Sequence, residues 1–409
     1  MSGLCRFCEA PLEHVFADLG MCPIANSLVT PETFGAMEPF YPLRVYVCEH
    51  CFLVQSEEFE SPAGIFSSAY PYFSSFSSSW LAHCETYAAE ITERLGLDER
   101  HTVVEVGSND GYLLQFFHRR GIRVLGVEPA ASVAQEAIVK GIPTLVRFFD
   151  SELAAELAQE SPADLVIGNN VLAHMPDVSD FVAGMVLVLA PEGVVTVEFP
   201  HLMRLVADSQ FDTIYHEHFS YFSLRTVRRI FERHGLRIFD VEELPTHGGS
   251  LRVYACHAGA ERHPESPSVA ELAEREHAAG YEDLEVYRSF GERMRAAKRE
   301  VLRCLIDAKE EGATIVGYGA PAKGATLLNY CGIGTDFLDY TVDKSPHKQG
   351  CFLPGVRIPI REPEAIRRTR PDYVLILPWN LKDEIVEEMA FVREWGGRFI
   401  VRTPAMTIL

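Results

Sequence analysis

The fold is decided by the stretch Val103-Val-Glu-Val-Gly-Ser-Asn-Asp-Gly-Tyr-Leu-Leu114. It predicts an apolar strand with Glu105 near its carboxyl end, followed by a turn and the start of a helix. Gly107 and Gly111 allow the backbone to turn tightly and to approach a ligand closely. The dinucleotide-binding fingerprint requires glycine where Asn109 stands, so this loop departs from that fingerprint.

Two later positions extend the same pattern. Glu128 ends the next apolar strand about 20 residues further on, where a carboxylate accepts hydrogen bonds from ribose hydroxyls. Phe149 lies near the end of the third unit, where an adenine ring is usually flanked. The alternative is an ordinary strand–turn–helix without a ligand. The pattern resembles the S-adenosylmethionine (AdoMet) loop of class I methyltransferases, which implies that the ligand is AdoMet rather than NAD.

Strands and helices alternate outward from this loop. Strands are expected over 101–106, 123–127, 164–168, 193–198, 236–243 and 250–257, with helices between the first four. Alternation at this pitch predicts an α/β fold with a doubly wound parallel sheet. The last two strands form a closing pair, which is compatible with a class I methyltransferase core.

A second alternation begins near residue 313, after a polar linker and a helical stretch over 269–311. Its first loop runs from Gly317 to Lys323 and matches the loose dinucleotide fingerprint, which is a weak signal alone. Its backbone N–H groups and Lys323 could instead hold a diphosphate at a helix N-terminus. Lys344 and Lys348 follow one unit later, although they can equally be solvated surface charges. We expect a smaller, Rossmann-like domain here.

Four cysteines in two pairs frame the N-terminal segment: Cys5, Cys8, Cys48 and Cys51. Two Cys-x-x-Cys turns can place four thiolates tetrahedrally around zinc, in a closed structural site without chemistry of its own. The pairs are further apart than the ~15–20 residues of a compact zinc ribbon. Unrelated buried thiols are therefore the alternative.

With this segment, the chain is expected to have three domains, over 1–75, 76–257 and 258–409.

Composition excludes several classes of protein. The 409 residues are 47% hydrophobic, which rules out wholesale disorder. A net charge of −21 argues against general nucleic-acid binding, although residues from 257 onward are nearly neutral and suit one anionic ligand. No apolar run reaches the ~18 residues of a membrane span, and no signal peptide is recognised. We expect a cytoplasmic protein without a membrane partner.

A histidine-rich segment, Tyr215-His-Glu-His-Phe219, follows the strand over 193–198. Open α/β sheets bind ligands at the carboxyl ends of their strands, and imidazole has a pKa suited to a general base. Asn170 and His174 follow another strand at the same edge, unless they only cap a helix. Tyr72, within Tyr70-Pro-Tyr72, can close over the pocket or simply pack in an aromatic loop.

These motifs together resemble the nucleotide-sugar C3-methyltransferases of deoxysugar pathways, of the tetronitrose and mycarose type. Besides the cysteines, the AdoMet loop and Tyr215 to Phe219, the resemblance includes Pro245-Thr-His-Gly-Gly249 and Asn329-Tyr-Cys-Gly-Ile-Gly334. It covers essentially the whole chain. It implies a zinc-binding N-terminal domain, an AdoMet-binding core and a C-terminal Rossmann-like domain that helps to bind a nucleotide sugar.

The resemblance also implies roles for single residues. His218 takes the position of the base, with Tyr215 and Glu217 beside it. The sugar pocket is lined by Tyr72, His174 and Asn170, the last of which also joins the cofactor site. Substrate binding is assigned to His216, His247, Lys323 and Lys344. Members of the family often carry Asp where this chain has His216, so the sequence leaves open which of the two imidazoles is the base.

The resulting hypothesis is AdoMet-dependent C3-methylation of a nucleotide-linked 4-keto-6-deoxyhexose. The expected nucleotide is dTDP, with GDP or CDP as alternatives, and no nucleic acid is expected as a partner. One rival is an NAD(P)-dependent ketosugar oxidoreductase, which would leave the pattern over 103–128 unused. Another is a zinc-ribbon RNA-binding module, which the acidic segment 1–75 argues against. The sequence does not fix the C2 and C3 substituents, the stereochemistry or the oligomeric state.

Overall fold

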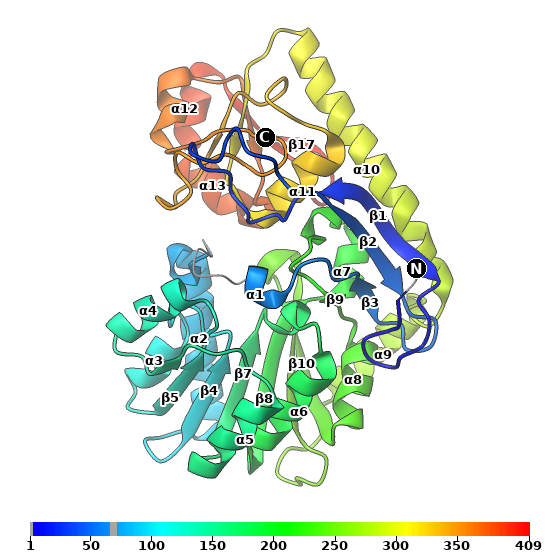
Figure 1. Cartoon of the computed structure of the whole chain (residues 1–409), viewed down its shortest axis with the longest axis vertical. Helices are drawn as coiled ribbons and strands as arrows, with labels where there is room; N and C mark the ends of the chain where they lie inside the picture. Colours follow the sequence, from blue (N-terminus) through cyan, green and yellow to red (C-terminus); the bar gives the residue numbers. More distant parts are fainter. Residues whose placement is uncertain (1–2, 66–71) are drawn as a thin grey trace. The chain divides into compact units, whose positions relative to one another are not determined.

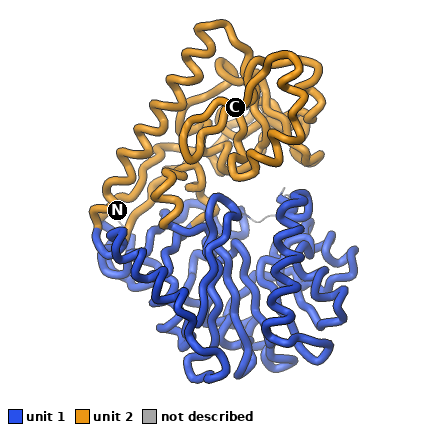
Figure 2. The backbone as a smooth tube through the Cα atoms, turned by 180° about the vertical axis from the view of Figure 1, so that it is seen from behind, with its two compact units in different colours: residues 1–13, 48–202, 219–283 blue, residues 14–47, 203–218, 284–409 orange. Residues whose placement is uncertain are grey.

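The computed structural model describes residues 3–65 and 72–409 (Figure 1). The chain forms two compact units, shown in different colours in Figure 2. Unit 1 comprises Met1–Glu13, Cys48–Leu202 and Phe219–Asp283, and unit 2 comprises His14–Val47, Met203–His218 and Leu284–Leu409. Neither unit is continuous in sequence, so segments that are far apart along the chain fold together.

A seven-stranded sheet forms the centre of unit 1, with the strand order β10-β11-β8-β7-β4-β5-β6. Its strands are β4 (Thr102–Val106), β5 (Arg123–Val127), β6 (Thr144–Leu145), β7 (Ala163–Asn169), β8 (Leu189–Pro200), β10 (Leu236–Leu244) and β11 (Ser250–His257). The strands from β4 to β8 pair in parallel, whereas β11 runs antiparallel to both β8 and β10. This confirms the doubly wound sheet with a closing strand pair.

Helices lie on both faces of this sheet, which explains why every residue of β4 is buried. The helices of unit 1 are α1 (Pro62–Ile65), α2 (Ser78–Leu95), α3 (Leu114–His118), α4 (Ala131–Val139), α5 (Ser151–Glu160), α6 (Val178–Val188), α8 (Leu224–Arg233) and α9 (Pro267–Ala278). Helix α2 begins where the Ser77 side chain accepts a hydrogen bond from the Trp80 backbone, and it ends at Gly96 in a left-handed conformation. Its apolar face joins the core through Tyr87 and Ile91.

Short elements complete unit 1. Strand β3 (Val54–Ser56) pairs antiparallel with β9 (Ser220–Tyr221). The 3-10 turns η1 (Ser74–Phe76), η2 (Leu172–His174) and η4 (Thr246–Gly248) lie in its connections, whereas η3 (Phe211–Thr213) belongs to unit 2. Helix α7 (Leu202–Ala207) begins where the chain passes into unit 2.

In unit 2, the hairpin of β1 (His14–Cys22) and β2 (Tyr41–Val47) packs on the long helix α10 (Leu284–Glu310). Phe16 of β1 stacks on Phe290 of α10, with ring centroids 4.4 Å apart. The largely helical stretch expected over 269–311 is formed by two helices, α9 and α10. Gly280 adopts a φ of 85° directly after α9, which a continuing helix cannot accommodate.

A second α/β sheet occupies the C-terminal part of unit 2, in the order β14-β13-β12-β15-β16-β17. Its strands are β12 (Ile315–Tyr318), β13 (Thr341–Val342), β14 (Ile360–Arg361), β15 (Tyr373–Ile376), β16 (Arg398–Val401) and β17 (Thr407–Ile408), and only β17 pairs antiparallel. Helices α11 (Ala322–Cys331), α12 (Glu364–Thr369) and α13 (Lys382–Glu388) connect them, with η5 (Trp379–Leu381) and η6 (Ala390–Trp395). The Rossmann-like C-terminal domain is therefore confirmed.

None of the helices in the described part of the chain combines the length and the apolar character that crossing a bilayer requires.

Candidate active site and metal centre

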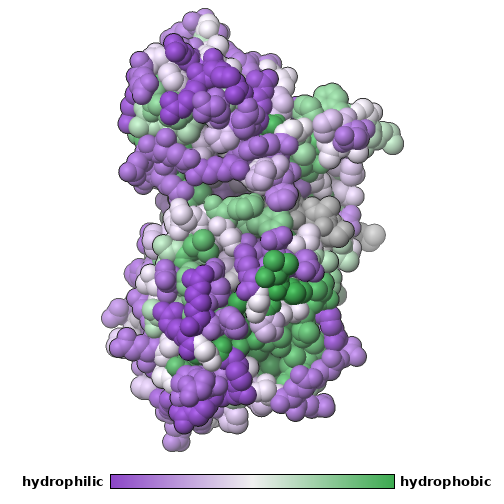
Figure 3. All heavy atoms as spheres, turned by 90° about the vertical axis from the view of Figure 1, so that its left-hand side faces the viewer, coloured by the Kyte–Doolittle hydropathy of each residue, from purple (hydrophilic) through white to green (hydrophobic). Residues whose placement is uncertain are grey.

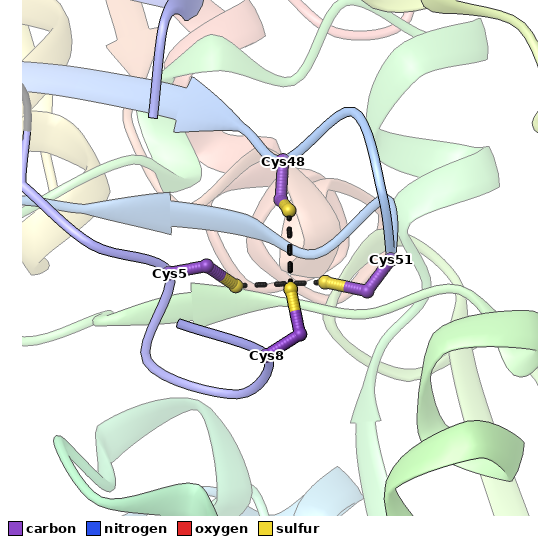
Figure 4. A group of neighbouring side chains, drawn as sticks. All are labelled: Cys5, Cys8, Cys48 and Cys51. Atoms are coloured by element: carbon purple, nitrogen blue, oxygen red, sulfur yellow. Dashed lines mark hydrogen bonds between the residues drawn. The ribbon is translucent and has the colours of Figure 1, made fainter. Parts of the chain in front are cut away.

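The four N-terminal cysteines form one cluster in unit 1 (Figure 4). All four Sγ atoms lie within 4.8 Å of one another, and the Cys5–Cys51 and Cys8–Cys48 sulfur pairs are each 3.5 Å apart. Zinc–sulfur bonds of about 2.3 Å in a tetrahedron place the sulfurs about 3.8 Å apart. The cluster therefore has the dimensions of a closed four-thiolate zinc site.

The two Cys-x-x-Cys turns have the same backbone geometry. The N–H groups of Glu9 and Phe52 each donate, at 2.9 Å, to the carbonyl of the first cysteine of their turn. Both residues adopt a left-handed φ, of 61° and 60°. Hydrogen bonds from Cys48 and Cys51 hold the pKa of Cys5 well below its ordinary value, and the same cysteine contacts raise the pKa of Cys51. A bound cation would favour the thiolate form of Cys51, which its cysteine neighbours oppose.

The first glycine loop brings its predicted residues together at the carboxyl ends of β4 and β5. Gly107 and Gly111 adopt φ values of 68° and 76°, and a Cβ on Gly107 would approach Val171 to 3.1 Å. The backbone N–H of Asn109 donates to Glu128 at 3.0 Å. Asn109 itself is left-handed, with a φ of 49°. Asparagine tolerates this conformation better than most residues, and such positions cluster at ligand sites.

Buried polar atoms gather at this edge of the sheet. The Ser108 hydroxyl, the Asn169 amide and the Asn170 Oδ1 atom have no hydrogen-bond partner among the described residues. Native proteins rarely leave such atoms unsatisfied, and ligands of α/β sheets bind at the carboxyl ends of the strands. These residues fit a polar ligand such as AdoMet.

Two buried carboxyl groups give the site its electrostatic character. Burial raises the pKa of Glu105 well above its ordinary value, with the nearby Glu128 and Asp110 acting in the same direction and the Tyr112 hydroxyl opposing them. Burial likewise raises the pKa of Glu128 to about 7, against the backbone hydrogen bonds that it accepts. A cationic ligand beside these groups would favour their ionised forms. The sulfonium of AdoMet is such a cation.

Phe149, which the sequence predicts beside the adenine ring, lies in the core of unit 1. Phe149 is buried and packs edge-to-face on Phe181, with centroids 5.6 Å apart. Its neighbour Phe148 is the exposed ring, at 39%. Figure 3 shows apolar side chains on the surface of unit 1. Exposed apolar residues of unit 1 include Val139 on α4 and Val146 after β6.

Sequence reasoning missed a charged network at the carboxyl end of β8. The buried Glu198 accepts hydrogen bonds from His83 at 3.0 Å, from Arg252 at 2.8 Å and from Thr246 at 2.8 Å. Trp80 packs between His83 and His247, with ring centroids 5.1 and 5.0 Å away. The predicted substrate residue His247 thus lies beside the network through its contact with Trp80, whereas no local spacing in the sequence signals Glu198 and Arg252.

The predicted residues that follow β7, and Tyr72 of the aromatic loop, also lie in unit 1. The Asn170 N–H donates to the Glu198 carbonyl at 2.6 Å, and His174 ends η2. Tyr72 is 42% exposed, and its carbonyl accepts a hydrogen bond from the Asn109 side chain at 3.2 Å. The predicted Tyr70 and Pro71 lie outside the described residues.

The segment from Tyr215 to His218 belongs to unit 2, and its two histidines differ. His218 Nδ1 donates to the Thr213 carbonyl at 3.0 Å, because a carbonyl can only accept. His216 Nε2 donates to the Pro42 carbonyl at 3.2 Å, and burial lowers the pKa of His216. The Tyr215 ring packs on His218 at 4.0 Å between centroids.

Glu217 is held beside these rings. Both of its carboxylate oxygens lie 2.8 Å from the Asn26 amide nitrogen, which donates to them. The N-terminal hairpin region therefore helps to orient the segment.

Three models of protein families match the chain. They are described as a zinc binding domain, over residues 5–66, a methyltransferase domain, over 80–241, and a C-methyltransferase C-terminal domain, over 245–404. The chain is 39% identical to the C-methyltransferase NovU of Streptomyces niveus, over 99% of this chain and 96% of that relative. The chain belongs to this C-methyltransferase family.

Solved structures match part of the chain at low sequence identity. The magnesium protoporphyrin IX methyltransferase of Synechocystis PCC 6803 with bound SAH is 16% identical, covers 43% of this chain and 83% of its own, and has a TM-score of 0.35. The PH0226 protein from Pyrococcus horikoshii is 13% identical, covers 46% and 94%, and has a TM-score of 0.37. The enzyme is an AdoMet-dependent C-methyltransferase with a structural zinc site.

The second glycine loop of this C-methyltransferase places Lys323 in the first turn of α11. Its Nζ donates to Asn380 Oδ1 at 2.7 Å and lies 4.7 Å from the centroid of the Trp379 ring. Burial lowers the pKa of Lys323 to about 8, although Asp212 acts in the opposite direction. Lys348 Nζ donates to the Ala320 carbonyl of the same loop at 2.9 Å.

Lys344 lies on the surface of unit 2. Its Nζ is 2.6 Å from a carboxylate oxygen of Glu388 and 3.7 Å from one of Glu384. The two predicted substrate lysines thus have different surroundings, one buried against an indole and one exposed beside two carboxylates.

Proposed function

We propose that this C-methyltransferase methylates C3 of a nucleotide-linked 4-keto-6-deoxyhexose. The observation that carries the proposal is the tautomer of His218. Its Nδ1 donates to a backbone carbonyl, which leaves Nε2 as the basic nitrogen. An imidazole held in this way is suited to removing a proton from carbon near neutral pH.

The proposed chemistry begins at the substrate ketone. A carbonyl at C4 makes the hydrogen at C3 acidic, and His218 Nε2 takes up that proton. The electron pair of the C–H bond moves into the enolate, whose oxygen needs nearby hydrogen-bond donors. The side chains of Tyr215, Tyr72 and His174 are our candidates for that role, and Glu217 orients the segment.

AdoMet, when bound, would supply an electrophilic methyl group to C3 of the enolate, with the sulfur–methyl bond breaking and its electron pair staying on the sulfur of the departing S-adenosylhomocysteine. The residues proposed to hold it are Glu105, Gly107, Asn109, Gly111, Glu128, Phe149 and Asn170. Their contribution is to fix the cofactor and to exclude water from the reacting atoms, because holding the reactants in position can lower the barrier by about 7–11 kcal/mol.

The second α/β domain supports the proposal that the substrate carries a nucleoside diphosphate. Lys323 lies in the first turn of α11, where backbone N–H groups also favour an anion. A nucleoside diphosphate bound there would neutralise a buried cation. We propose dTDP as the nucleotide, with GDP and CDP as the alternatives to be tested.

The test is incubation with AdoMet and a panel of nucleotide-linked 4-keto-6-deoxy sugars, followed by mass spectrometry for the added methyl group. Deuterium uptake at C3 from heavy water reports the proton removal alone. We expect His218→Asn to abolish both readouts while AdoMet still binds. Full turnover in His218→Asn would refute the assignment, and loss in His216→Asn alone would move the base to that residue.

A further inference from the structure

The segment that carries His218 is anchored on the C-terminal α/β domain of its own unit. Asp212, in η3, is fully buried, and its Oδ2 accepts a hydrogen bond from Trp379 Nε1 at 2.6 Å. Arg402 lies 3.6 Å from the other carboxylate oxygen and donates to the Ser209 carbonyl at 2.5 Å. A buried, charge-assisted hydrogen bond of this length is a strong anchor.

A second anchor comes from α11. The Thr326 hydroxyl donates to the Ile214 carbonyl at 3.1 Å, and both groups are buried. Thr213 lies between the two anchored residues, Asp212 and Ile214. Its carbonyl is the acceptor that fixes the tautomer of His218.

The indole of Trp379 has contacts on two sides. Its Nε1–H donates to Asp212, and the Nζ of Lys323 lies over its ring in a cation–π contact. The glycine loop proposed for the diphosphate and the turn that holds the base therefore share one side chain. None of these residues belongs to the motif from Tyr215 to His218 itself.

We propose that Trp379, Asp212 and Thr326 are positioning residues for the base: the C-terminal α/β domain sets the tautomer and the direction of His218. This inference rests on the proposed function of His218. The chain of contacts runs from the Trp379 indole through the Asp212 carboxylate and the Thr213 carbonyl to the imidazole. Misplacing a reacting group by about 1 Å costs up to about 100-fold in rate, so a loosened anchor has a measurable effect.

The first test compares Trp379→Phe with Trp395→Phe. Phenylalanine keeps an aromatic face under Lys323 but removes the donor to Asp212. Trp395 is a matched control, because its Nε1 donates to the Pro371 carbonyl at 2.9 Å in the same domain. For Trp379→Phe we expect kcat and AdoMet-independent deuterium uptake to fall at least about ten-fold, with KM changed less than about two-fold and AdoMet affinity unchanged. Trp395→Phe should keep all four values.

The second test is Thr326→Val, which keeps the shape of the side chain and removes only the donor to Ile214. It should show the same fall in kcat without a change in KM, and it decides the question if Trp379→Phe fails to fold. Nitrogen-15 NMR of the wild type should show His218 with the proton on Nδ1, and a mixture of tautomers in either variant.

The outcomes separate this inference from the proposed function. Turnover of Trp379→Phe or Thr326→Val equal to that of Trp395→Phe overturns the positioning role, even if the melting temperature is lowered. Turnover retained in His218→Asn overturns the proposed function instead. If His218→Asn is inactive while Trp379→Phe and Thr326→Val are fully active, His218 is the base but the proposed positioning residues have no role.

Discussion

At the scale of single residues, Glu198 shows how this fold keeps a buried charge ionised. Burial alone would raise the pKa of its carboxyl group. The hydrogen bond from His83 and the charge of Arg252 outweigh that effect and lower the pKa to about 2. The carboxyl end of β8 therefore carries a fixed negative charge at neutral pH, next to the backbone that Asn170 contacts.

This pKa predicts how stability depends on pH. The unfolded value is about 4.3, so the native state binds the proton more weakly than the unfolded chain does. The stabilisation from Glu198 is present above about pH 5 and is lost as the pH falls through 4 toward 2, about 3 kcal/mol in all. Denaturant unfolding at successive pH values should show that the free energy of unfolding falls less over that window in Glu198→Gln than in the wild type. Glu156→Gln, at an exposed carboxylate, should keep the wild-type dependence, and an unchanged dependence in Glu198→Gln would contradict the argument.

The cysteine cluster predicts a metal-dependent stability. Structural zinc contributes roughly 10 kcal/mol or more of binding energy to small domains. Cys8→Ser should therefore lose its zinc, measured by elemental analysis, and unfold at a much lower temperature. Cys304→Ser serves as the control, because Cys304 is a half-buried thiol outside the cluster. Equal zinc content in the two variants would exclude the cluster as the site.

At the scale of elements, two glycines between β4 and β5 separate two effects of a glycine: Gly107 in the loop after β4 and Gly121 after α3. Gly107 and Gly121 both have positive φ, at 68° and 77°, so alanine at either should cost about 1–2 kcal/mol of stability. Only Gly107 also adjoins another side chain, that of Val171, whereas no atom lies within 4 Å of a Cβ on Gly121. Calorimetric titration should show weakened AdoMet binding for Gly107→Ala alone. Equal affinity in both variants would place the cofactor elsewhere.

The elements of the parallel sheets could be predicted from the sequence, because a strand buried on both faces is a continuous apolar run. The hairpin of β1 and β2 was missed, since β1 alternates irregularly between buried and exposed residues. The charged network was missed for a different reason. Its members His83, Glu198 and Arg252 come from a helix and two strands, and no local spacing connects them.

At the scale of the whole molecule, sequence order and spatial grouping differ. The sequence predicts three domains that follow one another along the chain. In space, the chain forms two compact units, and each is assembled from three separate segments. Residues 14–47 lie between the cysteine pairs but group with unit 2, and so does the segment 203–218. Composition and spacing carry no information about such regrouping, because it depends on long-range packing. The AdoMet loop thus belongs to one unit and the proposed base to the other.

This division predicts that the two ligands protect different amides from hydrogen exchange. Binding slows exchange where a ligand stabilises local structure, so AdoMet should protect the loops around Gly107 and Glu128 in unit 1. A nucleoside diphosphate, tested as dTDP, should protect the loop from Gly317 to Lys323 in unit 2, despite the net charge of −21. Lys323→Met should lose the second protection and keep the first. Protection of unit 1 by dTDP, or equal protection in Lys323→Met, would mean that the diphosphate binds elsewhere.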